Sequence, residues 1–124
     1  MKASDFEERL FLKYLKLLGL RKQNPGFEYL REIVHAQISK IPFENLSKLL
    51  YKKRINLNGL IDFELYLEGI EKYNFGGTCY TNNFYFNQLL EWLGFEVKLC
   101  GADMKEPNVH LVNIVKLGNQ DFLI

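Results

Sequence analysis

The sequence has 124 residues, of which 48% are hydrophobic and 25% charged, as is usual for one soluble globular domain with a modest core. Its net charge of +1 gives no reason to expect binding to nucleic acid or to an anionic membrane. Two cysteines do not make a secreted disulfide framework, the N-terminus turns acidic instead of opening an apolar signal segment, and no apolar run approaches the length of a membrane span. We therefore expect a reduced, cytoplasmic protein.

The first forty residues predict two helices. Residues 4–7 form a capping box, and the apolar positions that follow recur at helical spacing up to a terminal glycine. A second helix is expected to open at Asn24-Pro25, with Asn as the cap and Pro at the first helical position, and to finish before Pro42. His35 lies on this helix without a partner at ligand spacing, so we interpret it as structural.

The middle of the chain predicts two more helices. A short one is expected to start at Pro42, with Glu44 in its first turn. The basic cluster that follows is interpreted as a solvated face. Residues 55–57 predict a short strand closed by a turn at Asn58-Gly59. The next helix is expected over residues 61–73.

Two glycines stand just before Cys79, and behind it an apolar pattern of helical period runs to Gly94. The glycines permit a tight turn that a Cβ would block. A helix is expected to begin at or next to Cys79, so that its free N–H groups and its dipole point at the sulfur. This placement favours the nucleophilic thiolate over the thiol. A lone buried cysteine is more often a small hydrophobe, and spacing alone leaves that alternative open.

After this helix, apolar residues recur at every second position, which is the period of a strand. Three stretches with strand patterns follow one another, at residues 95–99, 109–115 and 122–124. The polar residues 103–108 predict a loop, and Gly118-Asn119 is a two-residue hairpin signal. A turn centred there would pair position 110 with position 127 and would place position 125 diagonally beside position 110. Positions 125 and 127 both lie beyond Ile124. Helices first and strands last predict an α+β fold.

Three features together resemble the arylamine N-acetyltransferases. They are the motif Gly-Gly-x-Cys-x-x-x-Asn at residues 76–83, the earlier run Ile-Pro-Phe-Glu-Asn-Leu at 41–46, and the later His110. The resemblance covers nearly the whole chain but only the N-terminal part of that family, whose members are considerably longer. It implies an N-terminal helical bundle over residues 1–94. Residues 95–124 would then be the first antiparallel strands of an incomplete β-barrel, with a cysteine-protease-like catalytic arrangement.

The resemblance implies ping-pong chemistry with acetyl-coenzyme A as co-substrate, without a metal or a permanently bound cofactor. Cys79 would attack acetyl-coenzyme A and become an acetyl-thioester, and His110 would activate it while an arylamine or hydrazine takes the acetyl group. Phe43 would line the substrate cleft. Structural support of the site would come from Glu44, Gly76, Gly77 and Asn83.

A third group should orient the imidazole of His110, and it is normally a carboxylate or an amide. In the family an Asp directly follows an apolar strand run that resembles residues 122–124, and here that Asp would stand just beyond Ile124. An Arg is also usual where Phe75 stands and a Glu where Thr81 stands, so an expected ion pair is missing from the wall of the site.

These departures lead us to expect weak or no activity from the 124-residue chain. An open apolar edge at residues 122–124 also predicts association between copies of the chain. Two other interpretations stay open. One is a degenerate, non-catalytic member or gene fragment that acts only in binding or association. The other is a papain-like thiol hydrolase, which is weakened because no Asn or Asp is placed to follow His110.

Overall fold

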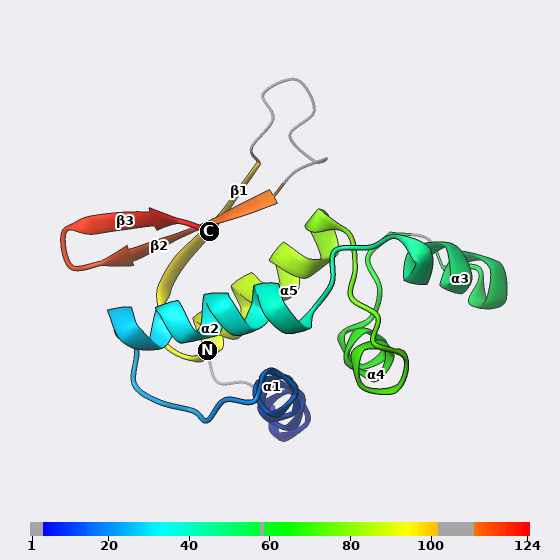
Figure 1. Ribbon diagram of the computed structural model, residues 1–124, viewed down its shortest axis with the longest axis horizontal. Helices are drawn as coiled ribbons and strands as arrows, with labels where there is room; N and C mark the ends of the chain where they lie inside the picture. Colours follow the sequence, from blue (N-terminus) through cyan, green and yellow to red (C-terminus); the bar gives the residue numbers. More distant parts are fainter. Residues whose placement is uncertain (1–3, 58, 102–110) are drawn as a thin grey trace.

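A computed structural model describes residues 4–57, 59–101 and 111–124. In the described residues the helices come first: α1 (Asp5–Leu18), α2 (Phe27–Lys40), α3 (Leu46–Ile55), α4 (Phe63–Tyr73) and α5 (Cys79–Trp92). They are followed by the strands β1 (Glu96–Gly101), β2 (Leu111–Leu117) and β3 (Gln120–Leu123). The strands form one antiparallel sheet in the order β1-β2-β3 (Figure 1). The prediction of a helical N-terminal part followed by antiparallel strands is confirmed.

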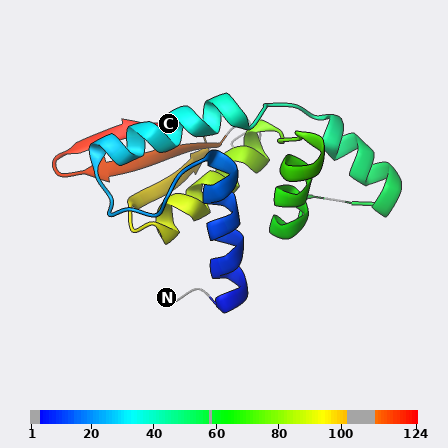
Figure 2. The ribbon, with the colours of Figure 1, turned by 60° about the horizontal axis from the view of Figure 1, so that its bottom comes forward.

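The sheet lies against α5. Alternate residues of β2 that face this helix, Leu111, Asn113 and Val115, are buried. The hairpin between β2 and β3 turns through Gly118 and the residue after it, as predicted, and Leu117 stands opposite Gln120, the first residue of β3. Both views place α3 at the end of the molecule away from the sheet, with α5 between them (Figures 1 and 2).

The core joins α1, α2, α4, α5 and the sheet. Much of it is aromatic: the ring of Tyr85 on α5 stacks on Phe63 at 4.8 Å and on Tyr66 at 4.9 Å between centroids. The buried hydroxyl of Tyr14 donates to Gln37 Oε1 at 2.7 Å, which links α1 to α2. Aromatic pairs at these spacings add stabilisation beyond their buried area, so we attribute the packing of the helices mainly to this core.

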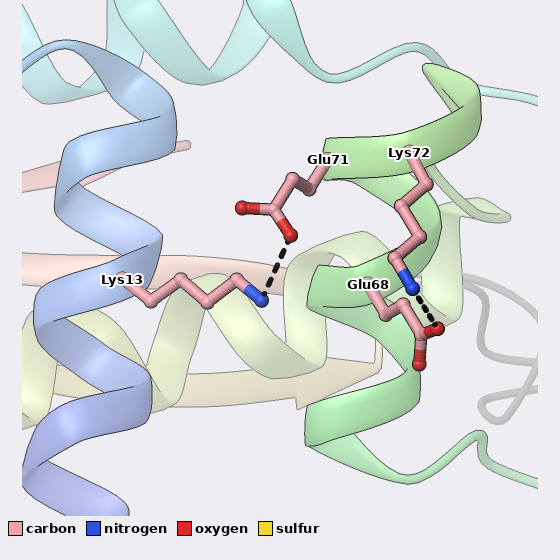
Figure 3. A network of polar contacts seen from close by, with 4 residues as sticks. All are labelled: Lys13, Glu68, Glu71 and Lys72. Carbon is pink, nitrogen blue, oxygen red and sulfur yellow. Dashed lines mark hydrogen bonds and ion pairs between the residues drawn. The ribbon is translucent and has the colours of Figure 1, made fainter.

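Two ion pairs lie on the surface where α1 meets α4 (Figure 3). Lys13 of α1 points toward Glu71 of α4, with 3.2 Å between nitrogen and oxygen. Within α4, Lys72 pairs with Glu68 one turn earlier at 2.9 Å. Solvent-exposed pairs of this kind contribute about 0–1 kcal/mol each. The Lys13–Glu71 pair, which joins the two helices, is therefore secondary to the core in holding α4 against α1.

The second helix starts later than the sequence predicts. Asn24-Pro25 does not open it; the helix begins at Phe27, and its cap is Gly26 in an extended conformation. The proline ring lies instead against Gly94, where an added Cβ would be 3.1 Å from Pro25 Cγ. A tertiary contact thus places this proline in the connection before the helix. The predicted end of the helix before Pro42 is confirmed.

The third helix also starts later than predicted, at Leu46. Pro42 and its neighbours are outside the helix, and Phe43 forms a parallel backbone bridge with Gly77. The strand predicted at 55–57 is wrong, because Ile55 is the last residue of α3 and the next residue ends the helix in the left-handed conformation. Asn58, the loop predicted at 103–108 and His110 lie outside the described residues.

The other helix predictions are confirmed. Ser4 accepts a hydrogen bond from the Glu7 N–H at 3.2 Å, and Gly19 ends α1 with φ of 74°. The fourth helix lies within its predicted range and is capped by Asp62. No helix in the described ranges is long and apolar enough to cross a membrane. The division into a domain of residues 1–94 and one of 95–124 stays a prediction.

Replacing Leu89 by Ala should lower the free energy of unfolding by about 2–5 kcal/mol, because the side chain is fully buried on α5 and its removal leaves a cavity. Leu49→Ala is the matched control, since that leucine is 57% exposed on α3 and its change should stay within about 0.5 kcal/mol. Urea unfolding measures both variants. Equal losses would contradict the assignment of the core to α5.

Candidate active site

Cys79 is the first residue of α5, as the sequence predicts. Thr78 caps the helix in an extended conformation, and its hydroxyl oxygen accepts from the Thr81 N–H at 3.5 Å. The cysteine is partly exposed and is not in a disulfide. Its sulfur therefore lies where the first N–H groups of a helix concentrate partial positive charge, which favours an anion.

The sulfur of Cys79 also contacts the neighbouring turn of α5 and strand β2. Asn83, one helical turn later, places its side-chain Nδ2 3.3 Å from Cys79 Sγ and donates to the Leu111 carbonyl oxygen at 2.6 Å. The sulfur itself is 3.8 Å from the same carbonyl. The predicted supporting residue Asn83 thus lies directly against the sulfur, and the site is formed where the start of α5 meets the start of β2.

The glycines before Cys79 allow two chain segments to come into contact. A Cβ added at Gly76 would lie 1.9 Å from the Pro42 carbonyl oxygen, so only glycine fits there. The Gly77 N–H donates to the same carbonyl at 3.3 Å, and the Gly77 carbonyl accepts from the Glu44 N–H at 3.0 Å. The backbone pairing of residues 42–44 with 76–77 fixes the turn from which α5 starts.

The carboxylate of Glu44 joins this pairing to α3. It accepts from the Ser47 N–H at 2.9 Å, from the Ser47 hydroxyl at 2.6 Å and from the Gly76 N–H at 3.1 Å. Burial alone would raise its pKa, but these donors together lower the pKa below its ordinary value. Glu44 therefore joins the start of α3 to the glycine turn as an anion held by backbone and hydroxyl donors.

Asn82 is a supporting residue that sequence reasoning missed. Its Nδ2 donates to the carbonyls of Pro42 at 3.2 Å and Gly77 at 3.1 Å, and its Oδ1 accepts from the Tyr66 hydroxyl at 2.7 Å. Burial raises the pKa of Tyr66, so this hydroxyl stays protonated and can donate. A signal for this residue exists in the sequence, because Asn82 is a polar residue on the helix face that also carries Tyr85, and this face is buried.

The aromatic side chains around the turn occupy two different places. Phe43 is 75% exposed, and its backbone is bridged to Gly77. Phe75 packs in a T-shaped arrangement on Tyr51 at 6.3 Å and lies 5.3 Å from Tyr73 between ring centroids. An aromatic cluster of Tyr51, Tyr73 and Phe75 thus lies directly before the glycine turn.

A pocket of about 530 Å³ lies between α3, the segment before α4 and the glycine turn. Its lining residues include Thr78, Thr81 and Lys48, together with the apolar residues Leu57, Leu60 and Ile61. Cys79 does not line it, because the sulfur faces β2. We therefore do not assign this pocket to the chemistry of the cysteine. No group of three or more metal-binding side chains was found within the described ranges.

The predicted partner His110 lies outside the described residues, but the residue that follows it, Leu111, supplies the carbonyl beside the sulfur. The other histidine, His35, is exposed on α2. Asp121 stands opposite Lys116 across the hairpin. The structure therefore brings together Cys79 and Asn83 with the glycine turn and Glu44, and it leaves the pairing of Cys79 with His110 as a prediction.

Comparison with known proteins identifies one family. Residues 26–124 match the sequence model of a family described as N-acetyltransferase. A curated relative is the pineal gland isozyme of arylamine N-acetyltransferase from Gallus gallus, which is 33% identical over 87 residues. That match covers 68% of this chain and 28% of the relative.

Solved structures of arylamine N-acetyltransferases have the same fold. The enzyme from Mycobacterium abscessus gives a TM-score of 0.74 at 23% identity, over 99% of this chain and 45% of that one. Arylamine N-acetyltransferase C from Bacillus anthracis gives 0.69 at 23% identity, over 93% and 47%. The Bacillus cereus enzyme, described as having a Cys-His-Glu catalytic triad, gives 0.66 at 25% identity, over 98% and 48%. The chain spans about half the length of these structures.

Replacing Gly76 by Ala should lower the free energy of unfolding by about 3 kcal/mol, because the new Cβ meets a backbone carbonyl that cannot rotate away. Gly26→Ala is the matched control. That glycine has no atom within 4 Å of an added Cβ, and as a helix cap it should cost about 0.5–1 kcal/mol. Both are measured by urea unfolding, and equal costs would show that the close approach at Gly76 is not required.

Replacing Glu44 by Gln should destabilise the protein at neutral pH and have less effect in acid. The pKa of Glu44 is lowered by folding, so its contribution is complete above the ordinary carboxyl pKa and is lost as the pH falls through the lowered value. The free energy of unfolding is measured from about pH 7 to about pH 3. The exposed Glu91→Gln serves as control. A difference between parent and Glu44→Gln that stays constant over this range would rule out the proposed role of the charge.

Proposed function

The chain belongs to the arylamine N-acetyltransferase family, and we propose that it transfers an acetyl group from acetyl-coenzyme A to an arylamine or hydrazine through a thioester on Cys79. The observation that carries this proposal is the position of Cys79 Sγ. It lies at the start of α5, 3.3 Å from the Nδ2 of Asn83 and 3.8 Å from a carbonyl of β2. An N–H donor and a helix N-terminus both stabilise a thiolate, which is the form of cysteine that attacks an acyl group.

In the first half of the reaction, the thiolate of Cys79 attacks the acetyl carbonyl carbon of acetyl-coenzyme A. A bond forms between Sγ and that carbon, the bond from the carbon to the coenzyme sulfur breaks, and the coenzyme leaves as a thiol after taking up a proton. Asn83 donates to the sulfur while it carries negative charge and is held in place by its second contact, to the Leu111 carbonyl. This arrangement supports attack by sulfur and needs no metal.

In the second half, the amine nitrogen of the acceptor attacks the thioester carbon. The carbon–sulfur bond breaks, the nitrogen loses a proton, and Cys79 returns to the thiolate. We propose that Phe43 contacts the acceptor, because its ring is exposed beside Gly77 and an aromatic face suits an arylamine.

We propose that His110 takes the proton from Cys79 and returns protons to the leaving groups. Imidazole titrates near neutral pH, and His110 directly precedes the residue whose carbonyl faces the sulfur. We do not propose any residue of the β2–β3 hairpin as the group that orients this imidazole. Asp121, the carboxylate of this hairpin, pairs with Lys116 across the turn.

The remaining proposals concern the surroundings of the site. We propose that residues 95–124 are the first strands of a β-barrel that follows the helical domain of residues 1–94. The edge of β3, where Leu123 is 73% exposed, is proposed as a surface through which copies of the chain associate. A cytoplasmic location is proposed because thiolate chemistry at Cys79 requires a reduced cysteine.

The test is incubation of the chain with acetyl-coenzyme A alone, followed by mass spectrometry of the cysteine peptides. We propose that transfer to an acceptor amine is weak or absent in the 124-residue chain, and we expect slow addition of one acetyl group to Cys79, none to Cys100, and no labelling in Cys79→Ala. The Cys100→Ala variant is the matched control and should label normally. Acetylation of both cysteines alike, or of neither, would contradict the proposal.

His110→Asn should slow this acetylation by about 10²–10⁴, the usual contribution of a general acid–base. His35→Asn is the matched control, because that histidine is exposed on α2, and its rate should equal that of the parent. The rate is followed against pH. Loss of the neutral-pH titration in His110→Asn alone would support the assignment, whereas equal profiles in both variants would remove His110 from the mechanism.

A further inference from the structure

Asn113 is the polar member of the buried face of β2. Its neighbours on the same face of the strand, Leu111 and Val115, are apolar, whereas Asn113 is polar and 0% exposed. Its backbone N–H and carbonyl are both used in pairing with Ile124, at 3.0 and 2.8 Å. Its side chain is therefore not needed to complete the sheet.

The side chain of Asn113 is only half satisfied. Its Nδ2 donates to the backbone carbonyl of Asn83 at 3.1 Å. Its Oδ1 is buried and has no hydrogen-bond partner among residues 4–57, 59–101 and 111–124. Burying an acceptor without a partner costs stability, and an apolar residue of the same size would avoid that cost. Hydrogen bonding of Oδ1 within the described part of the chain therefore does not explain why an asparagine stands here.

The one bond that Asn113 makes leads to the sulfur. Asn113 holds the backbone of Asn83, and the side chain of Asn83 reaches Cys79 Sγ and the Leu111 carbonyl. An amide nitrogen carries two hydrogens, so Asn83 can serve both acceptors only if α5 stays at a fixed distance and rotation from β2. Apolar packing is not directional, whereas the hydrogen bond from Asn113 is.

We propose that Asn113 is a positioning residue for the nucleophile. It fixes the second turn of α5 on β2 so that the amide of Asn83 stays directed at the sulfur of Cys79. It acts through Asn83 and does not touch the reacting atoms. This inference rests on the proposed role of Cys79 as the nucleophile.

The variant Asn113→Leu removes both the donor and the unpaired acceptor at similar size. We expect the urea midpoint to stay close to that of the parent, because the lost hydrogen bond is offset by the removal of a buried acceptor that has no partner among the described residues. The alkylation rate of Cys79 should nevertheless fall by about two- to tenfold, the factor that corresponds to one ordinary hydrogen bond.

Val115→Ala is the matched control, since it lies on the same strand and face, is fully buried and is two residues from Asn113. It should lower the urea midpoint and leave the rate of Cys79 unchanged. A purely structural role for Asn113 predicts the opposite pattern, in which reactivity changes only together with stability.

The measurement is iodoacetamide labelling against pH, resolved by peptide mass spectrometry, with Cys100 as the internal reference. The double variant with Asn83→Ala tests whether Asn113 acts through Asn83. Once the Asn83 amide is gone, Asn113→Leu should cause no further fall in the alkylation rate of Cys79. Should Asn113→Leu fail to fold, Asn113→Thr removes the same amide with a strand-compatible side chain and must show the same fall.

An unchanged rate at Cys79 in the Asn113 variants, or an equal further loss in the Asn83→Ala background, would overturn the inference. These outcomes are rate ratios between variant and parent, and they do not depend on acetyl transfer. Absence of acetylation in the parent would contradict the proposed function alone, and the labelling ratios would still decide the role of Asn113.

Discussion

The contact on which the site depends is the pairing of the segment at Pro42 with the glycine turn before α5. The Pro42 carbonyl occupies the space that a side chain at Gly76 would need, and it accepts from both the Gly77 N–H and the amide of Asn82. The same pairing brings Glu44 to the start of α3 and to the turn. Two helices thus begin at one junction, and the position of the cysteine follows from it.

The sulfur is held by a second contact of a different kind. The glycine junction fixes where α5 begins, but only β2 fixes what the sulfur faces, through the Leu111 carbonyl and the amide of Asn83. The sheet packs on α5 through alternate residues of β2. Within this packing, the side chain of Asn113 donates a hydrogen bond to the backbone carbonyl of Asn83, and this bond is directional. Helical part and sheet therefore share one site, although each forms its own secondary structure.

Sequence patterns predicted the features that depend on neighbours in the chain. The capping box at Ser4, the start of α5 at Cys79 and the hairpin at Gly118 are local signals, and each was found where expected. The starts of α2 and α3 were misplaced because Pro25 and Pro42 make contacts with distant glycines that override their preference for opening a helix. The roles of Asn82 and Asn113 likewise arise only when separate elements pack together, and no spacing in the sequence indicates their partners.

The site has a consequence for the order of folding. The bond from Glu44 to Gly76 and the contact of Cys79 with Leu111 each join residues 32 positions apart. The helices and the β2–β3 hairpin form from contacts within a few residues, which close quickly, whereas contacts across longer loops must first overcome the entropy of bringing the ends together. We infer that the cysteine meets its surroundings late, after the helices and the hairpin exist.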